Sequence, residues 1–86
     1  MIADRLEAAR AELRVTTKAQ IDTAAADTWG ARAVVAWEFY MSTGDLGWRD
    51  LSAEFAHEAI EHAAGGAPGT LERVRSELRL CTGGCL

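Results

Sequence analysis

Hydrophobic residues recur at helical spacing near the start of the chain. Ile2, Leu6, Ala9 and Leu13 are three or four residues apart, and Glu and Arg fill much of the opposite face. This pattern predicts an amphipathic helix over residues 2–14. Because its apolar stripe is thin, and a helix of this length is marginal in water by itself, we expect it to dock on another surface.

A second helix is predicted over residues 17–42. Thr17 and Gln20 fit a capping box, whose two side chains satisfy free backbone N–H groups at the start of a helix. Gly30 lies inside the segment at a cost of about 1 kcal/mol relative to alanine, which makes it a candidate kink. Residues 31–41 are rich in Val, Trp, Phe and Tyr, which also favour strands. A strand is therefore the alternative there, although the alanine-rich stretch before it favours a helix.

Turn residues divide the second half of the chain. The sequence GDLGW at 44–48 predicts a turn, with Asp45 or Asp50 capping a helix over residues 48–64. A short, flexible, glycine-rich linker follows, and a last helix is predicted over residues 70–80. The two glycines in the closing CTGGCL segment prevent that helix from continuing.

These elements predict an all-α fold. We expect a small bundle of three to four helices, forming one domain over residues 1–80, with a flexible Cys-containing tail over residues 81–86. The 86 residues include one proline and many alanines, and alanine has the highest helix propensity. Alanine buries little area, so larger apolar groups between residues 29 and 60 are expected to form the core. A domain this small often gains stability from a partner, a metal or a disulfide.

Charge changes the expectation about partners. The formal net charge is −4. The middle of the chain carries the excess, with Asp22, Asp27, Glu38, Asp45, Asp50, Glu54, Glu58 and Glu61 against Lys18, Arg32 and Arg49. A nucleic-acid-binding protein would show the opposite bias, so no nucleic-acid partner is expected. A protein partner with a basic surface fits this charge better.

We also expect a cytoplasmic protein without membrane association. The first residues are charged and lack the apolar core of a signal peptide. The longest apolar stretch, AVVAWEFYM at 33–41, is too short to span a bilayer and contains Glu38.

The segment EFAHEAIEH at 54–62 is the most suggestive for chemistry. On a helix, one face would carry Asp50, Glu54, His57, Glu58 and Glu61. One interpretation is a solvated acidic face whose carboxylates favour the protonated form of its histidine and give pH sensitivity near neutrality. The two histidines of the segment are five residues apart, not four as in a zinc protease, so that class is excluded.

A metal site is the alternative for this segment. Glu54-x-x-His57, together with Glu38 from the preceding helix, resembles half of the carboxylate site in ferritin-like di-iron proteins. The resemblance covers residues 38–57. It implies that a second copy would complete a site for iron or another divalent metal. Glu38 has a second interpretation, in which it points outward or forms a surface ion pair with an arginine.

The tryptophans Trp29, Trp37 and Trp48 belong either to the core or, if exposed, to an interface, where tryptophan is enriched. Cys81 and Cys85 offer two ligands, too few for zinc. They are inert thiols, a disulfide, or part of a modified peptide released by cleavage after the AAGG at 63–66.

Together these patterns favour a non-catalytic protein-interaction module without a cofactor, such as an accessory subunit, regulator or inhibitor of a larger assembly. We expect a homodimer or a subunit of a complex. The candidate interaction residues are Trp29, Trp37, Trp48, Asp50, Glu54, Glu58 and Glu61. The alternatives are a ferritin-like half-bundle that binds metal at a dimer interface, and a precursor of a ribosomally made, modified peptide.

Overall fold

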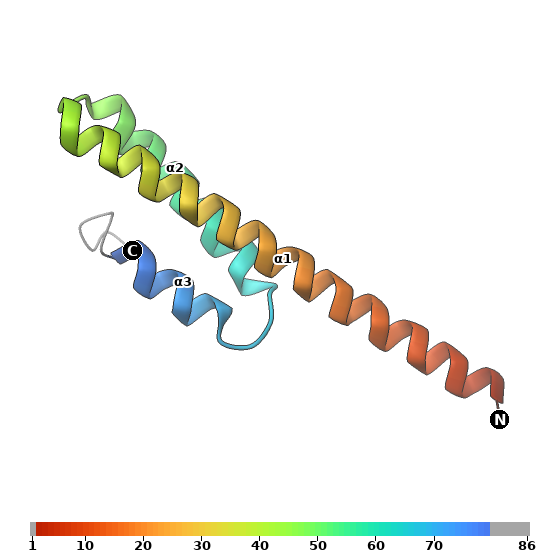
Figure 1. Ribbon diagram of the computed structural model, residues 1–86. Coiled ribbons are helices and arrows are strands. Elements are labelled where there is room, and N and C mark those ends of the chain that lie inside the picture. Colours follow the sequence, from red (N-terminus) through yellow and green to blue (C-terminus); the bar gives the residue numbers. More distant parts are fainter. Residues whose placement is uncertain (1, 80–86) are drawn as a thin grey trace.

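Three helices make up the part of the chain that the computed structural model describes, residues 2–79, and no strand occurs there (Figure 1). They are α1 (Ile2–Thr43), α2 (Leu46–Ala64) and α3 (Thr70–Arg79). The predicted all-α fold is confirmed, and residues 31–41 are helical rather than extended. The expected tail over residues 81–86, with Cys81 and Cys85, lies outside the described residues.

The two helices predicted in the N-terminal half are one continuous helix, so the predicted break at residues 15–16 is wrong. Valine and threonine, which occupy these positions, lower helix propensity much less than glycine or proline would. The hydroxyl of Thr16 donates to the carbonyl oxygen of Glu12, 3.0 Å away and one turn earlier, within the helix. α1 also continues through Gly30. At 1.5 Å per residue, α1 spans about 63 Å, which accounts for the longest dimension of the molecule, 64 Å.

A tight turn reverses the chain between α1 and α2. Gly44 has a φ of 72°, a left-handed conformation that glycine adopts without strain, and its N–H donates to the carbonyl oxygen of Tyr40 at 2.8 Å. Asp45 then caps α2, because its side chain accepts a hydrogen bond from the N–H of Gly47 at 2.8 Å. Of the two caps predicted, Asp45 is the one used. α2 runs back alongside the C-terminal half of α1, forming a helical hairpin (Figure 1).

Small residues form the seam between α1 and α2. Its buried positions include Ala26 and Ala33 on α1 and Ser52, Ala56, Ala59 and Ala63 on α2. On α2 they recur at steps of four and three residues, the spacing of a coiled-coil seam. The expectation of a core made of larger groups is wrong here, since Trp29, Phe55 and Ile60 are only partly buried against this alanine cluster. Short side chains let the two helix backbones come close together.

α3 completes the bundle on one side of the hairpin. Leu78 and Val74 are each 1% exposed and are the two largest fully buried side chains among the described residues. The guanidinium of Arg73 contacts the carboxylate of Asp27 on α1 at 2.8 Å. α3 runs in the same direction as α1 and opposite to α2, which makes an up-down-up arrangement (Figure 1).

The linker between α2 and α3 is bonded to α1. The N–H of Ala67 donates to the hydroxyl oxygen of Thr23 at 2.9 Å, and the hydroxyl of Thr70 lies 3.3 Å from the same oxygen. Gly66 packs so closely that a Cβ atom there would lie 2.7 Å from that oxygen and 3.4 Å from the backbone nitrogen of Thr23. The predicted flexible linker is therefore held in place, and glycine is required at Gly66 by the close approach.

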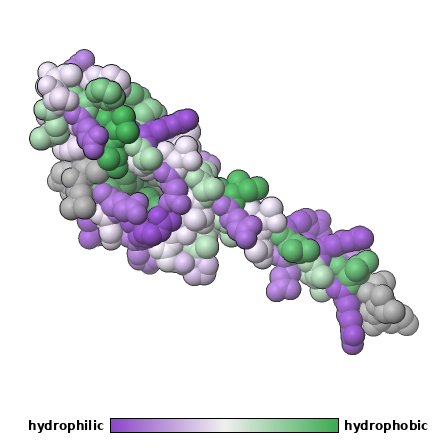
Figure 2. All heavy atoms as spheres, in the orientation of Figure 1, coloured by the Kyte–Doolittle hydropathy of each residue, from purple (hydrophilic) through white to green (hydrophobic). Residues whose placement is uncertain are grey.

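The first part of α1 projects beyond the bundle, and we call residues 4–18 the arm (Figures 1 and 2). Every residue of the arm is exposed. Leu6, Leu13 and Val15 are 52%, 65% and 71% exposed. The predicted amphipathic segment is thus helical, but it does not dock on any other part of residues 2–79.

Candidate interaction surface

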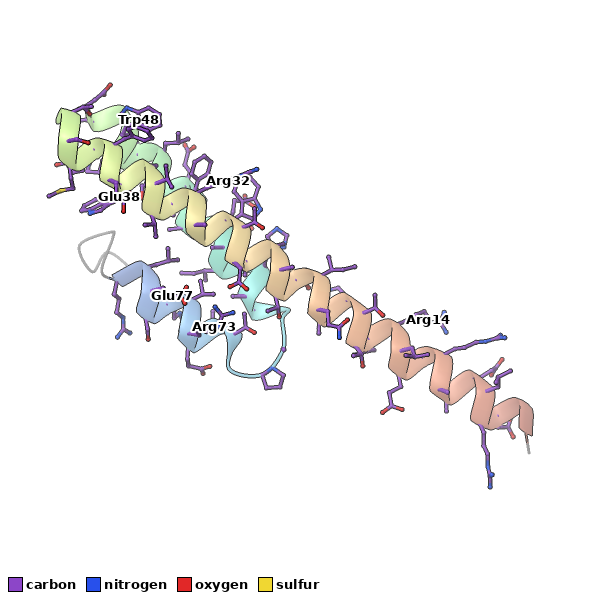
Figure 3. The ribbon with its side chains drawn as sticks, viewed as in Figure 1. Arg14, Arg32, Glu38, Trp48, Arg73 and Glu77 are labelled. Carbon is purple, nitrogen blue, oxygen red and sulfur yellow. The ribbon has the colours of Figure 1, made fainter. Side chains whose placement is uncertain are left out.

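The hairpin carries an apolar groove, which we call the aromatic groove. Its lining includes Arg32, Val35 and Ala36 from α1 and Trp48, Leu51 and Phe55 from α2. Figure 3 shows Arg32 and Trp48 on one side of the hairpin and α3, with Arg73 and Glu77, on the other. The groove is therefore on the face that α3 leaves open.

Ring contacts hold the aromatic groove in shape. Phe39 of α1 stacks on Trp48 of α2, with ring centroids 4.8 Å apart and planes at 27°. Trp29 and Phe55 form a tilted pair at 5.5 Å, and the guanidinium of Arg32 lies 4.9 Å from the ring of Trp29. Each aromatic pair joins the two helices, so the groove is fixed by the same packing that holds the hairpin together.

Much of this surface stays in contact with solvent. Val35 and Phe39 are 49% and 46% exposed, whereas the rings of Trp48 and Phe55 are half-buried. Partly exposed aromatic side chains that converge from two helices are typical of binding surfaces, because they offer large apolar contact area in a fixed geometry.

Carboxylates border the groove on the α2 side. Glu54 and Glu58 line a depression next to the aromatic groove that also includes Trp29 and Phe55. Asp50 and Glu61 continue the same face of α2, one turn to either side. We call Asp50, Glu54, Glu58 and Glu61 the acidic rim. The predicted acidic face therefore lies directly beside the aromatic side chains.

The predicted tryptophans have different places. Trp29 and Trp48 border or line the groove and are half-buried. Trp37 packs against Tyr40 instead, with ring centroids 5.1 Å apart, and is absent from the groove lining. The positions of Trp29 and Trp48 at the groove support the predicted interaction role for these two residues. For Trp37 that role stays a prediction.

The predicted metal ligands do not come together within one chain. Glu54 and His57 lie one turn apart on α2, where His57 contacts Glu61 at 3.0 Å. Ser52 of α2 is level with Ala33 of α1 because they share a hydrogen bond. Counting along the two antiparallel helices from that point puts Glu38 and Glu54 roughly 10 Å apart along the hairpin axis.

Glu38 also points elsewhere. It lines a shallow pocket with Val35, Phe39 and Ser42, and Figure 3 shows it on the opposite side of the hairpin from Trp48. Among residues 2–79, no group of three or more His, Cys, Asp or Glu side chains is placed to hold a metal ion. A metal site shared between two copies remains a prediction.

A polar cluster at the end of α2 was not predicted. Asp22 of α1 accepts a hydrogen bond from Lys18 at 2.7 Å and contacts His62 of α2 at 3.5 Å. The hydrogen bond from Lys18 lowers the pKa of the Asp22 carboxyl, and His62 contributes to the same shift. The four-residue spacing of Lys18 and Asp22 on a helix could have predicted their ion pair. The contact with His62 could not be predicted in this way, because it depends on how α2 packs on α1.

No helix within residues 2–79 has the length and apolar character needed to cross a membrane. Comparisons of the chain with protein-family models, with curated proteins and with solved structures return no match. What the chain does must therefore be inferred from the aromatic groove and the acidic rim themselves.

Proposed function

We propose that the protein is a non-catalytic interaction module that binds an amphipathic, basic helix of a partner protein in the aromatic groove. The observation that carries this proposal is the convergence of Phe39, Trp48 and Phe55, held in ring contacts yet partly open to solvent, on the face that α3 leaves free. A groove between two helices accommodates a third helix, whose apolar side chains fill the space between the rings.

The acidic rim defines the charge of that partner. Glu54 and Glu58 border the groove along one side, so a helix lying in it would place its polar flank against carboxylates. Lysine and arginine side chains on that flank would be attracted to the carboxylates, whereas acidic side chains would be repelled. This charge preference supplies specificity and a faster encounter, and the aromatic rings supply most of the binding free energy.

Binding, rather than a reaction, is the role that this surface supports. The polar side chains beside the groove, Glu54, His57 and Glu58, lie along α2, and Arg32, which lines the groove from α1, lies over the ring of Trp29. Catalysis needs groups that converge on one reacting atom in a site shielded from water. We therefore propose that the protein acts by occupying its partner, as an accessory subunit, regulator or inhibitor of a larger assembly.

Photo-crosslinking in the native cell tests the proposal. Benzoylphenylalanine in place of Phe39, which stacks on the groove residue Trp48, is a conservative probe at the edge of the groove, and the same residue in place of exposed Ser76 on α3 is the matched control. We expect a discrete cross-linked partner from position 39 and none from position 76, with the cross-linked segment basic and amphipathic. Equal cross-linking from both positions, or none from position 39, would contradict the proposal.

Charge reversal sharpens the same experiment. Glu54→Lys reverses a carboxylate of the acidic rim, and Glu72→Lys makes the same change on exposed α3. We expect the first variant to lose most of the cross-link and the second to keep it.

A further inference from the structure

The arm has an apolar stripe on one side of α1, formed by Leu6, Ala9 and Leu13. Asp27 of α1 pairs with Arg73 of α3, and Leu13 and Leu6 lie fourteen and twenty-one residues before it. Steps of seven residues stay on one side of a helix, with a drift of about 20° each. Ala9 lies between the two leucines at coiled-coil spacing. The two leucines therefore lie about 40° and 60° round the helix from Asp27, which is at the exposed edge of the contact with α3, and they come before the point where α3 begins.

Within residues 2–79, nothing covers this stripe. Leu6 and Leu13 are 52% and 65% exposed, and Figure 2 shows apolar side chains as separate patches along the projecting arm. A helix of about this length is marginal in water unless its apolar side is packed against something. Packing against a partner helix would therefore stabilise the conformation that the arm has in α1.

We propose that a second copy of this chain is that partner, and that the arms of two copies pack antiparallel through Leu6, Ala9 and Leu13. The charged residues that flank the stripe favour this antiparallel pairing. Arg5 and Glu12 each precede a leucine and border the stripe on one side, whereas Arg10 follows Ala9 and borders it on the other.

Antiparallel packing makes these charges complementary. When Leu6 of each copy lies beside Ala9 of the other, Arg5 of each copy comes next to Glu12 of the other. Two-fold symmetry makes this contact twice. Parallel packing would instead bring Arg5 of each copy next to Arg10 of the other, which gives two like-charge contacts. The charge pattern thus selects the antiparallel dimer and disfavours the parallel one.

The dimer is expected to be weak and reversible. In this register the two helices overlap for about 18 Å, far less contact than a standard interface of about 1,600 Å². Monomer and dimer should therefore both be populated between about 10 μM and 1 mM. The dimer carries two aromatic grooves on one particle, which raises its avidity for a partner that presents two binding helices.

Sedimentation equilibrium over that concentration range tests the dimer. The mass should rise from 9.3 kDa toward twice that value. Arg5→Glu should lower the association constant roughly tenfold, since two attractive contacts become repulsive. Arg14→Glu makes the same charge change elsewhere on the arm and should have little effect. The double variant Arg5→Glu/Glu12→Arg should restore the association.

Several results would overturn the proposal. They are a monomer at every concentration, equal weakening by Arg5→Glu and Arg14→Glu, and failure of the double variant to recover. A spin label at Thr17→Cys, with Cys81 and Cys85 replaced by serine, tests the orientation. The antiparallel register puts the two labelled backbones about 28 Å apart along the axis, whereas parallel arms would put them about 10 Å apart. The short distance would also overturn the proposal. These outcomes leave the proposed function of the groove untouched, since the arm is not part of it.

Discussion

The hydroxyl of Ser52 donates a hydrogen bond to the backbone carbonyl oxygen of Ala33, 2.7 Å away across the seam between α1 and α2. A serine side chain is short, so this bond forms only where two helix backbones come unusually close. The neighbouring positions Ala56 and Ala59 are 0% exposed. The seam therefore combines a close helix approach, a buried polar contact and small side chains, and each of them has a measurable consequence.

Replacing Ser52 with alanine should cost about 1 kcal/mol of unfolding free energy. The variant loses one buried hydrogen bond but leaves no polar side-chain atom without a partner, so the cost stays moderate. Urea denaturation followed by circular dichroism measures it. Ser42→Ala removes an exposed hydroxyl that bonds to its own helix, at the carbonyl oxygen of Glu38, and should cost less. A larger loss of unfolding free energy for Ser42→Ala than for Ser52→Ala would show that the hydrogen bond across the seam does not stabilise the fold more than a bond within one helix.

Enlarging a seam residue should be more damaging. Ala59→Leu adds three carbon atoms where no space is available, which forces the helices apart and should cost about 1–3 kcal/mol. Ala24→Leu makes the same change at an exposed position of α1 and should alter the unfolding free energy by less than about 0.5 kcal/mol. Equal losses from the two variants would mean that helix propensity, rather than the close approach, decides stability.

Two glycines should respond to alanine in opposite directions. A Cβ atom at Gly30 would have no neighbour within 4 Å, so Gly30→Ala should stabilise the helix by about 0.5–1 kcal/mol. At Gly66 the added atom would lie 2.7 Å from the hydroxyl oxygen of Thr23 and 3.3 Å from the carbonyl oxygen of Ala63, so Gly66→Ala should destabilise the fold. Thermal unfolding of the two variants should therefore shift the midpoint up and down respectively. A shift in the same direction for both would contradict the packing of the linker.

Sequence patterns predicted the helical class because propensity and caps are local properties. Asp45 and the glycines after α2 mark helix ends that are real. The break expected near Thr17 did not occur. The residues of a capping box are also tolerated inside a helix, and no glycine or proline ends the helix there. The core was misjudged for a different reason. Ala56, Ala59 and Ala63 recur at heptad spacing in the sequence. They matter because short side chains let the two helix backbones approach closely, which the size of a hydrophobic side chain does not indicate.

The candidate surface was predictable only in part. The shared face of Glu54 and Glu58 follows from helical period alone. The contact between Phe39 and Trp48, and hence the groove, depends on the register of two antiparallel helices. That register is set by the seam and the turn, not by the residues that line the groove. For the same reason, no local sequence pattern predicts the contact between Asp22 and His62, which lie forty residues apart in the sequence.

Asp22 gives the fold a pH dependence of definite sign. Its side chain is 16% exposed, and the hydrogen bond from Lys18, with a smaller contribution from His62, lowers the pKa of its carboxyl in the folded chain. In the unfolded chain the same carboxyl titrates near its ordinary pKa, about 3.9. The unfolded state therefore binds the proton more readily. The contribution of Asp22 to stability is present above that ordinary value and is lost as the pH falls through the lower, folded pKa.

Asp22→Asn should therefore destabilise the protein at neutral pH and matter progressively less as the pH falls from about 5 to about 2. Urea denaturation of both proteins across this range measures the difference in unfolding free energy, which should shrink with the protonation of Asp22. Asp4→Asn removes the same charge from the arm, outside the bundle, and should leave bundle unfolding unchanged throughout. If the difference for Asp22→Asn were constant with pH, it would not depend on the protonation of Asp22, and the charge of Asp22 would contribute nothing to stability.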